Sequence, residues 1–206
     1  MSFRLTPIRT LIVKDENKFV SRAEGKLAGA VRAFSYDFRG KVVLDIGSST
    51  GGFTEFALQH GAKKVIAVEK GTRQMKAPLR FDSRIDLREK TDIFSVEREE
   101  IDEIDTILAD VSFTSLTNVL AYAKMSLARR NTDYLVMLKP QFEAEEKQLN
   151  KGVVKNEKIR REIIKKFENW LIANGFLILG KRDNEVVGKN GNQERFYFLR
   201  AARKSL

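Results

Sequence analysis

A glycine-rich turn near the start of the chain could do chemistry in two different ways. It lies in the stretch "LDIGSSTGGF", residues 44–53, where an apolar run ends and a helical pattern begins. Gly47, Ser49 and Gly51 fit G-x-S-x-G, the turn that presents a nucleophilic serine in α/β-hydrolases. The same turn also fits the loop with which an α/β fold holds a nucleotide-like cofactor. The two interpretations require different partner residues elsewhere in the chain.

The hydrolase interpretation fails because no general base is available. A serine nucleophile of this kind needs a histidine that follows it in the chain and is held by an acid. The sequence has one histidine, His60, which stands 11 residues after Ser49, at the end of the predicted helix. Since that helix separates the two side chains, we expect His60 to be a helix-terminal residue that interacts with the helix dipole.

The cofactor interpretation has the residues that it needs. Glycines let a backbone approach a ligand closely, and the first turn of a helix offers free N–H groups. Asp45 precedes the turn, and Glu69 ends the next predicted strand, where a carboxylate could accept both hydroxyls of a ribose. Ser49 stands where the dinucleotide fingerprint G-x-G-x-x-G needs glycine, and the P-loop pattern is missing. The two acids suit S-adenosylmethionine, whose sulfonium and amino groups are cationic.

Alternating strands and helices must position these residues. Apolar runs rich in valine and isoleucine predict strands, and segments with helical spacing lie between them. This alternation predicts an α/β fold with a Rossmann-like, mostly parallel, twisted sheet that is covered on both faces. The predicted strands are 41–47, 63–71, 84–90, 103–111 and 133–140, and the predicted helices are 20–36, 52–61, a short one near 73–80, 115–130 and 156–175.

The end of the chain departs from this alternation. Two apolar runs, 176–183 and 195–201, follow the last predicted helix and are joined by a turn-rich segment. Two successive strands joined by so short a segment should form a hairpin. We therefore expect an antiparallel last strand on the otherwise parallel sheet.

Composition narrows the class of protein. The 206 residues suffice for one domain, and 42% hydrophobic with 32% charged residues is typical of a globular chain. With no cysteine and one histidine, we expect no disulfide, no metal site and a cytoplasmic location. No apolar run is long enough to cross a membrane. The net charge of +10 favours a polyanionic partner, above all nucleic acid.

Six motifs, in this order, resemble the TlyA/hemolysin A family of FtsJ-type ribose 2′-O-methyltransferases. They are "VSRAEGKL", "LDIGSSTGGFTEFALQHGAKKVIAVEKG", "ADVSFTSL", "LKPQFE", "KGVV" and "GNQERFYFL". The resemblance implies a Rossmann-like methyltransferase domain that uses S-adenosylmethionine and acts on ribosomal RNA or ribosomal subunits. This domain is expected over 19–206, after an N-terminal tail or arm, 1–18.

The resemblance also implies a catalytic tetrad of two lysines, an aspartate and a glutamate. Its members match Lys26, Asp110, Lys139 and Glu194. Methyl transfer to a ribose hydroxyl requires alignment of that hydroxyl and removal of a proton from a poor acid. Lys139 is the expected base, with Lys26 and partial burial disfavouring its ammonium form. Asp110 and Glu194 are expected to orient the lysines and to steady the developing charge.

For the cofactor, the resemblance implies contacts around the glycine-rich turn and at later strand ends. Glu69 stands where the family usually has aspartate, with the same ribose role, and Asp92 matches a contact to the adenine edge. Asp45, Asp110 and Lys139 fall, like Glu69, at carboxyl ends of predicted strands, where open α/β sheets bind ligands. The implied cofactor-binding residues are Asp45, Gly47, Ser49, Gly51, Phe53, Glu69, Asp92 and Asp110.

Basic segments flank this edge in the sequence and could contact RNA phosphates. The predicted contacts are Arg22, Arg73, Lys76 and Arg80, although ordinary solvation explains the same pattern equally well. Family members usually carry a small S-four-like RNA-binding domain at the N-terminus, and we expect no such domain here. The pair Ala23-Glu24 also replaces two small residues that usually precede the first lysine.

Three alternatives stay open. The chain could methylate a base or a protein, although the Asp/Asn-Pro-Pro-aromatic motif of amino-group methyltransferases reads Asp110-Val111-Ser112-Phe113 here. It could instead be a non-enzymatic RNA- or ribosome-binding module that keeps the fold. The hemolysin label raises pore formation, but no amphipathic membrane-inserting stretch stands out.

Overall fold

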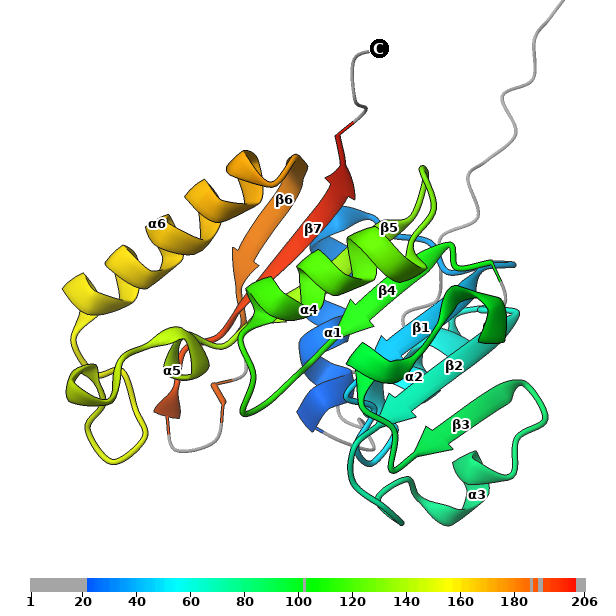
Figure 1. Ribbon diagram of the computed structural model, residues 1–206. Coiled ribbons are helices and arrows are strands. Elements are labelled where there is room, and N and C mark those ends of the chain that lie inside the picture. Colours follow the sequence, from blue (N-terminus) through cyan, green and yellow to red (C-terminus); the bar gives the residue numbers. More distant parts are fainter. Residues whose placement is uncertain (1–21, 102, 186, 189–190, 203–206) are drawn as a thin grey trace, which may run out of the picture.

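Seven strands and six α-helices make up the described part of the chain. A computed structural model describes residues 22–101, 103–185, 187–188 and 191–202 (Figure 1). The predicted tail or arm, 1–18, lies outside these residues. Among the described residues, no helix has the length and apolar character needed to cross a membrane. The α-helices are α1 (Arg22–Phe34), α2 (Gly52–Gln59), α3 (Ala77–Arg80), α4 (Leu116–Tyr122), α5 (Pro140–Glu143) and α6 (Glu157–Ala173).

All seven strands belong to one sheet. Its order is β3-β2-β1-β4-β5-β7-β6, and the five strands from β3 to β5 run parallel (Figure 1). β7 runs antiparallel to both β5 and β6. The predicted Rossmann-like sheet with an antiparallel last strand is therefore confirmed. The strands are β1 (Val42–Ile46), β2 (Lys64–Glu69), β3 (Ile85–Glu89), β4 (Thr106–Ala109), β5 (Asp133–Leu138), β6 (Phe176–Asp183) and β7 (Arg195–Ala201).

The strand order creates a switch point between β1 and β4, where the chain changes direction across the sheet. Open α/β sheets bind ligands at such a point, outside the carboxyl ends of the strands. We call this side of the sheet the carboxyl edge and the opposite side the amino edge. Because β7 is antiparallel, its first residue, Arg195, pairs with Leu138, the last residue of β5. The segment that precedes β7 therefore reaches the carboxyl edge.

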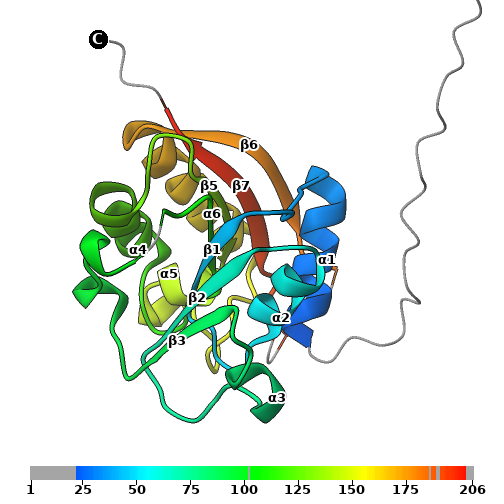
Figure 2. The ribbon, with the colours of Figure 1, turned by 90° about the vertical axis from the view of Figure 1, so that its right-hand side faces the viewer.

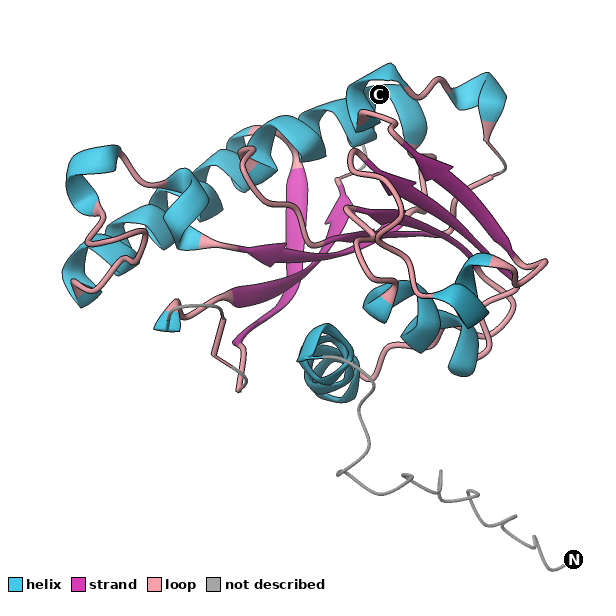
Figure 3. Ribbon diagram, turned by 90° about the horizontal axis from the view of Figure 1, so that it is seen from below, coloured by secondary structure: helices cyan, strands magenta, loops and turns pink. Residues whose placement is uncertain are grey.

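Helices cover both faces of the sheet (Figures 2 and 3). On one face, Leu120 of α4 and Leu171 of α6 are fully buried, and on the other, Leu27 of α1 and Phe56 of α2 pack against the strands. β4 and β5 are buried along their whole length. A strand covered on both faces has no solvent side, which explains why these segments read as continuous apolar runs.

Two helices are shorter than the sequence predicted. The segment 73–80 contains only α3, because Arg73 has a left-handed φ of 53° that a right-handed helix does not accept. The helix predicted over 115–130 stops at Tyr122 and continues as one π-helical turn, η3 (Ala123–Leu127). Three short 3₁₀ turns lie in the connections, η1 (Ile93–Ser95), η2 (Arg98–Glu100) and η4 (Glu146–Gln148).

Candidate active site

The loop between β1 and α2, residues 47–51, has a backbone that requires glycine at two positions. Gly47 and Gly51 have φ values of 81° and 92°, in the left-handed region. A Cβ atom at Gly51 would lie 2.3 Å from Leu79 Cδ2, and one at Gly47 would lie 3.1 Å from Asp110 O. The N-cap residue of α2 is Gly51, which has no side chain that could bond the first N–H groups of the helix. We call this segment the glycine loop.

The carboxylate of Glu69 binds the glycine loop from the neighbouring strand. β1 and β2 are parallel neighbours, so the end of β2 lies beside the loop. Glu69 Oε2 accepts a hydrogen bond from Ser49 N at 2.9 Å, and Oε1 accepts one from Gly71 N at 2.7 Å. Gln74 Nε2 donates a longer hydrogen bond to Oε1 at 3.4 Å. A carboxylate has about four acceptor sites, so Glu69 can still accept a ribose hydroxyl, and a second one if it displaces Gln74.

Asp45 and Phe53, two predicted cofactor contacts, lie beneath the glycine loop and are 1% and 3% exposed. Asp45 Oδ2 accepts a hydrogen bond from Thr54 Oγ1, in the first turn of α2, at 2.6 Å. Burial, opposed by this hydrogen bond, raises the pKa of Asp45 to about 7. Direct contact of these two residues with a cofactor stays a prediction.

Two buried polar atoms, in or next to the glycine loop, have unused hydrogen-bonding capacity. Asp45 Oδ1 and Ser48 Oγ are buried and have no hydrogen-bond partner among the described residues. Buried polar atoms are nearly always paired, so these two have capacity for the donors and acceptors of a bound group. Together with the bare glycine backbone, they fit the polar amino-acid end of S-adenosylmethionine.

Asp92 lies farther along the same edge and caps η1. Its Oδ2 accepts a hydrogen bond from Lys70 Nζ at 2.9 Å, and its Oδ1 accepts one from Phe94 N at 3.2 Å. The hydrogen bond from Lys70 lowers the pKa of Asp92. Since Lys70 directly follows Glu69, Asp92 stands close to the predicted ribose contact. Its contact with an adenine stays a prediction.

Two of the predicted catalytic residues form an ion pair at the switch point. Asp110 follows β4 and Lys139 follows β5, and these strands are parallel neighbours. Lys139 Nζ lies 2.6 Å from Asp110 Oδ1 and donates a hydrogen bond to Ser112 Oγ at 2.9 Å. The two side chains are 12% and 19% exposed, so the pair is largely shielded but still open to a substrate.

The other two predicted catalytic residues form a second ion pair. Nζ of Lys26, in α1, contacts Oε2 of Glu194, although 168 positions separate them in the sequence. Glu194 immediately precedes β7, whose register pairs Arg195 with Leu138, so it lies next to Lys139 at the carboxyl edge. The structure thus brings the four residues together as two lysine–carboxylate pairs.

Three of the predicted RNA contacts lie in one segment, at α3 and just before it. Arg73 and Lys76 are exposed in the segment that follows β2. Arg80 pairs with Glu89, Nη2 to Oε2 at 2.6 Å, and its side chain is only 25% exposed. Arg22 begins α1, but its side chain lies outside what the structure describes. For all four residues, contact with RNA stays a prediction.

Sequence reasoning missed an exposed aromatic side chain beside the ion pairs. Phe113 is 92% exposed and has a left-handed φ of 64°. Its ring centroid lies 5.2 Å from that of Phe142, and Lys139 Nζ lies 5.7 Å from the Phe142 centroid. Strained, exposed aromatic residues beside a reactive group can serve as platforms for a flat ligand ring. The only signal in the sequence was the position of Phe113, three residues after Asp110.

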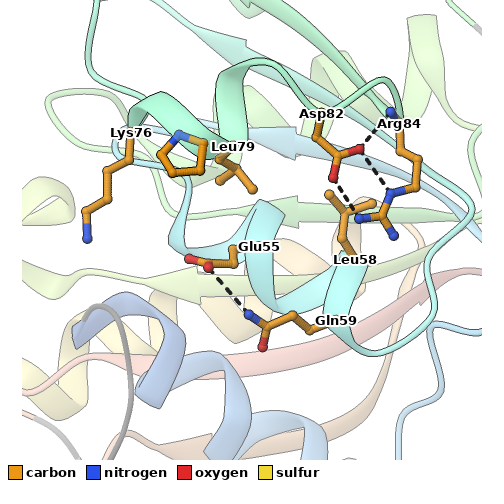
Figure 4. A pocket seen from close by; sticks show the side chains of 8 residues that line it. Glu55, Leu58, Gln59, Lys76, Leu79, Asp82 and Arg84 are labelled. Atoms are coloured by element: carbon orange, nitrogen blue, oxygen red, sulfur yellow. Dashed lines mark hydrogen bonds and ion pairs between the residues drawn. The ribbon is translucent and has the colours of Figure 1, made fainter.

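Two surface hollows lie outside this site. The first, about 280 Å³, lies between α2 and α3, and Leu79 in its wall is the side chain behind Gly51 (Figure 4). The second, about 360 Å³, lies between α4, α5 and α6, with Phe142 and Trp170 in its lining. Neither is lined by the four paired residues or by the glycine loop. In the described part of the chain, no group of three or more acidic or histidine side chains could hold a metal ion.

His60 takes the position predicted for it. It ends α2, where its Nδ1 lies 2.8 Å from Phe56 O and its ring stacks on the Phe56 ring with a centroid distance of 3.8 Å. Because it is held at the far end of this helix, it does not serve Ser49 as a general base. The hydrolase interpretation is excluded on geometry as well as on chain order.

Comparison with known proteins gives matches along almost the whole chain. Residues 19–201 match the model of the family described as FtsJ-like methyltransferase. A Mycobacterium tuberculosis (strain H37Rv) relative named 16S/23S rRNA (cytidine-2′-O)-methyltransferase TlyA is 36% identical over 197 residues, 95% of this chain and 73% of the relative. The 23S rRNA (cytidine-2′-O)-methyltransferase TlyA of Campylobacter jejuni (strain 81-176) is 36% identical over 182 residues, 87% of this chain and 70% of the relative. A solved structure of a candidate hemolysin from Streptococcus thermophilus superposes with a TM-score of 0.86 at 31% identity, over 92% of this chain and 69% of that one.

Proposed function

Because the chain belongs to the FtsJ-like methyltransferase family, we propose that it transfers a methyl group from S-adenosylmethionine to a ribose 2′-hydroxyl of ribosomal RNA. The observation that carries this proposal is the pairing of Lys139 with Asp110 and of Lys26 with Glu194 beside the glycine loop. Relatives named as ribosomal RNA (cytidine-2′-O)-methyltransferases support the same reaction and substrate. The resemblance to the TlyA/hemolysin A family is confirmed by these comparisons.

The residues at the carboxyl edge fit S-adenosylmethionine, which supplies an electrophilic methyl group when bound. The glycine loop would receive its amino-acid end, where Ser48 Oγ and Asp45 Oδ1 have unused hydrogen-bonding capacity. Glu69, already fixed by Ser49 N, would accept the ribose hydroxyls. Asp92 would face the adenine end of the site.

In the proposed reaction, Lys139 removes a proton from the substrate hydroxyl. As the neutral amine, Lys139 Nζ would take the proton from the 2′-hydroxyl as that oxygen gains a methyl group, and Asp110 would stabilise the ammonium that forms. Asp110 Oδ1, 2.6 Å from this nitrogen, holds the amine beside it by its charge. Lys26, held by Glu194, places a second cation where the hydroxyl oxygen gains negative charge. The two carboxylates therefore position the two lysines and need not touch the substrate.

The proposed substrate agrees with the charge of the chain. A net charge of +10 attracts the RNA backbone, whose phosphates supply most of the affinity in such complexes. Ribosomal RNA as substrate also places the reaction in the cytoplasm. The four basic residues predicted as RNA contacts belong to this proposal, and Arg73 and Lys76 among them are exposed.

The test is transfer of labelled methyl from S-adenosylmethionine to isolated ribosomal subunits and to naked ribosomal RNA. A 2′-O-methyl group blocks alkaline cleavage, so label should survive in an alkali-resistant dinucleotide. Lys139→Ala should abolish this label, whereas Lys41→Ala, which removes a partly buried lysine at the amino edge, should keep it. The two variants carry the same change of charge.

Other outcomes would contradict the proposal in recognisable ways. Label that alkali releases as single nucleotides, or label in protein, would assign a different acceptor to the same fold. Cofactor binding without any label would assign a binding module. Full activity of Lys139→Ala would remove the base assignment while leaving the reaction itself in place.

The cofactor contact has its own measurement. Glu69→Ala should weaken S-adenosylmethionine binding about tenfold in calorimetry, the loss of roughly one charged hydrogen-bond acceptor. Glu89→Ala is the matched control, because Glu89 also ends a strand but pairs with Arg80. Equal affinity of Glu69→Ala and wild type would overturn the ribose assignment.

A further inference from the structure

A short hairpin between α5 and α6 carries an exposed lysine at its tip. Asn150 and Val153 exchange two backbone hydrogen bonds, at 2.9 and 3.1 Å. Lys151 and Gly152 between them have left-handed φ values of 50° and 78°, as in a two-residue turn of type I′. Glycine adopts this conformation freely, but lysine does so at a cost. The turn therefore holds Lys151 outward in a conformation that its own backbone does not favour.

Asn192, in the segment between β6 and β7, binds this hairpin. Its side-chain Oδ1 accepts a hydrogen bond from Val154 N at 3.2 Å, and its Nδ2 donates one to Gly152 O at 3.1 Å. Its backbone O accepts a hydrogen bond from Gly188 N at 2.9 Å. Asn192 is only 4% exposed, so these bonds are shielded from water. One buried amide thus binds both the turn, at Gly152, and the strand that leaves it, at Val154.

The segment that contains Asn192 also places Glu194, the predicted catalytic glutamate. Glu194 lies two residues later, and a Cβ atom at Gly188 would lie 2.6 Å from Glu194 Oε1. Arg160 Nε, in α6, donates to Gln193 O at 3.3 Å, which ties the same segment to α6. The hairpin and Glu194 are therefore held by one packed segment at the carboxyl edge, where Figure 1 shows the α5–α6 connection beside the start of β7.

We propose that Lys151 contacts a phosphate of the RNA strand next to the target nucleotide, and that Asn192 is the residue that positions it. This inference rests on the proposed function. Within the described part of the chain, Lys151 is exposed and forms no ion pair, so its charge is available to a partner. A lysine binds phosphate as a point charge and does not read the base, which suits a contact that sets the register of the strand.

Lys147, in the same connection, provides the comparison. It pairs with Glu145, Nζ to Oε2 at 2.8 Å, and its side chain is 80% exposed. Its charge is therefore already matched by a neighbour, and among the described residues its turn has no hydrogen bond to the segment of Glu194. The two lysines therefore differ in whether they have an ion-pair partner and in whether their turn is bound by Asn192.

The first test measures binding of naked ribosomal RNA over a range of salt concentrations. Lys151→Ala should weaken binding about five- to tenfold at low salt and lower the slope of log K against log salt by about 1. Its KM for RNA should rise, whereas its affinity for S-adenosylmethionine should not change. Lys147→Ala should stay close to wild type. Wild-type affinity and slope for Lys151→Ala would overturn the proposal.

The second test asks whether Asn192 acts through Lys151. Asn192→Ala should weaken RNA binding as much as Lys151→Ala, and the double variant should be no weaker than either single variant. Losses that add in the double variant would overturn the positioning role. Gly152→Ala, which places a side chain at a left-handed position and leaves Asn192 untouched, should reproduce the same loss even if Asn192→Ala fails to fold.

Failure of the inference and failure of the proposed function give different results. A wild-type protein that binds RNA but transfers no methyl group would contradict the enzymatic proposal, and the salt slope of Lys151→Ala would still decide the role of the hairpin. Methyl transfer with normal RNA affinity in Lys151→Ala would leave the enzyme in place and remove the hairpin contact.

Discussion

Two lysine–aspartate pairs lie at opposite edges of the same sheet. At the carboxyl edge, Lys139 Nζ lies 2.6 Å from Asp110 Oδ1, and at the amino edge, Lys41 Nζ lies 3.3 Å from Asp133 Oδ2. Asp110 directly follows β4 and Asp133 is the first residue of β5, and both lysines are partly buried. The two pairs therefore consist of the same residue types, a lysine and an aspartate.

At the amino edge, neighbouring side chains form hydrogen bonds with the polar groups of the pair. Tyr36 OH donates to Asp133 Oδ2 at 3.2 Å and lies 2.6 Å from Thr106 Oγ1, while Lys41 Nζ donates to Tyr36 OH at 2.8 Å. Arg200 Nη2 binds the other oxygen, Asp133 Oδ1, at 2.6 Å. Burial raises the pKa of Tyr36, so its hydroxyl stays a donor throughout the ordinary pH range. This cluster holds the starts of the strands together.

The carboxyl-edge pair has surroundings that leave capacity for a ligand. Ser48 Oγ is buried without a partner in the described part of the chain, the glycine loop presents bare backbone, and Phe113 stands 92% exposed beside the pair. A lysine–aspartate pair is therefore no signature of catalysis by itself. What distinguishes the site is unsatisfied polar capacity and exposed aromatic surface around it.

The largest effect should come from exchanging the two lysines for alanine in turn. Lys139→Ala should lower methyl transfer about 10³-fold, or about 4 kcal/mol of transition-state stabilisation, because a general base contributes on that scale. Lys41→Ala should leave the rate per folded molecule unchanged. The hydrogen bonds of Lys41 go to Tyr36 and Asp133, which both lie at the amino edge. Single-turnover kinetics with saturating cofactor would measure both. Equal losses of rate in the two variants would contradict a catalytic role that is specific to the carboxyl-edge pair.

The next effect concerns Asp45, whose folded-state pKa of about 7 lies above its usual value of 3.8. A raised pKa means that the folded state holds the proton more tightly, so this stabilisation is complete below about pH 4 and lost as the pH rises through about 7. Asp45→Asn cannot ionise, so its stability relative to wild type should increase as the pH rises, by on the order of 3 kcal/mol between pH 5 and pH 8. Urea unfolding at pH 5 and pH 8 would measure the gap, and a gap that does not grow would contradict the assignment.

Replacing each aspartate by asparagine should separate stability from activity. Asp133→Asn should lower the free energy of unfolding by about 2 kcal/mol, because two cations and a tyrosine lose their shared acceptor charge. Asp110→Asn should cost less stability, since one cation depends on it, but should slow methyl transfer. Denaturant midpoints and methyl-transfer rates for both variants would decide. A larger loss of stability in Asp110→Asn would reverse the comparison.

The smallest effect should come from Phe113. Phe113→Ala should lower kcat/KM for RNA about tenfold, near 1.4 kcal/mol, if its exposed ring stacks on a base of the substrate. Phe81→Ala is the matched control, because Phe81 is 80% exposed but lies at the end of α3. Cofactor affinity should be unchanged in both. A tenfold loss in Phe81→Ala as well would show that general surface effects explain the result.

Much of the fold follows from local patterns in the chain. The apolar runs of β1, β4 and β5 could be read directly because these strands are buried on both faces. The ends of the helices were less certain, as the left-handed residue Arg73 shows. Its conformation depends on the turn that surrounds it, and a periodicity of apolar residues carries no information on that turn.

The sequence by itself determined the glycine loop, the acid at the end of β2 and the parallel sheet that carries them, because each depends on neighbours within one or two elements. Only the tertiary structure decided that Lys26 meets Glu194, across 168 positions, since the antiparallel register of β7 places that glutamate at the carboxyl edge. The exposure of Phe113 and the hydrogen bonds from Asn192 to the hairpin of Lys151 likewise depend on the tertiary structure. Burial and hydrogen-bond partners belong to packed surroundings, and no local spacing encodes them.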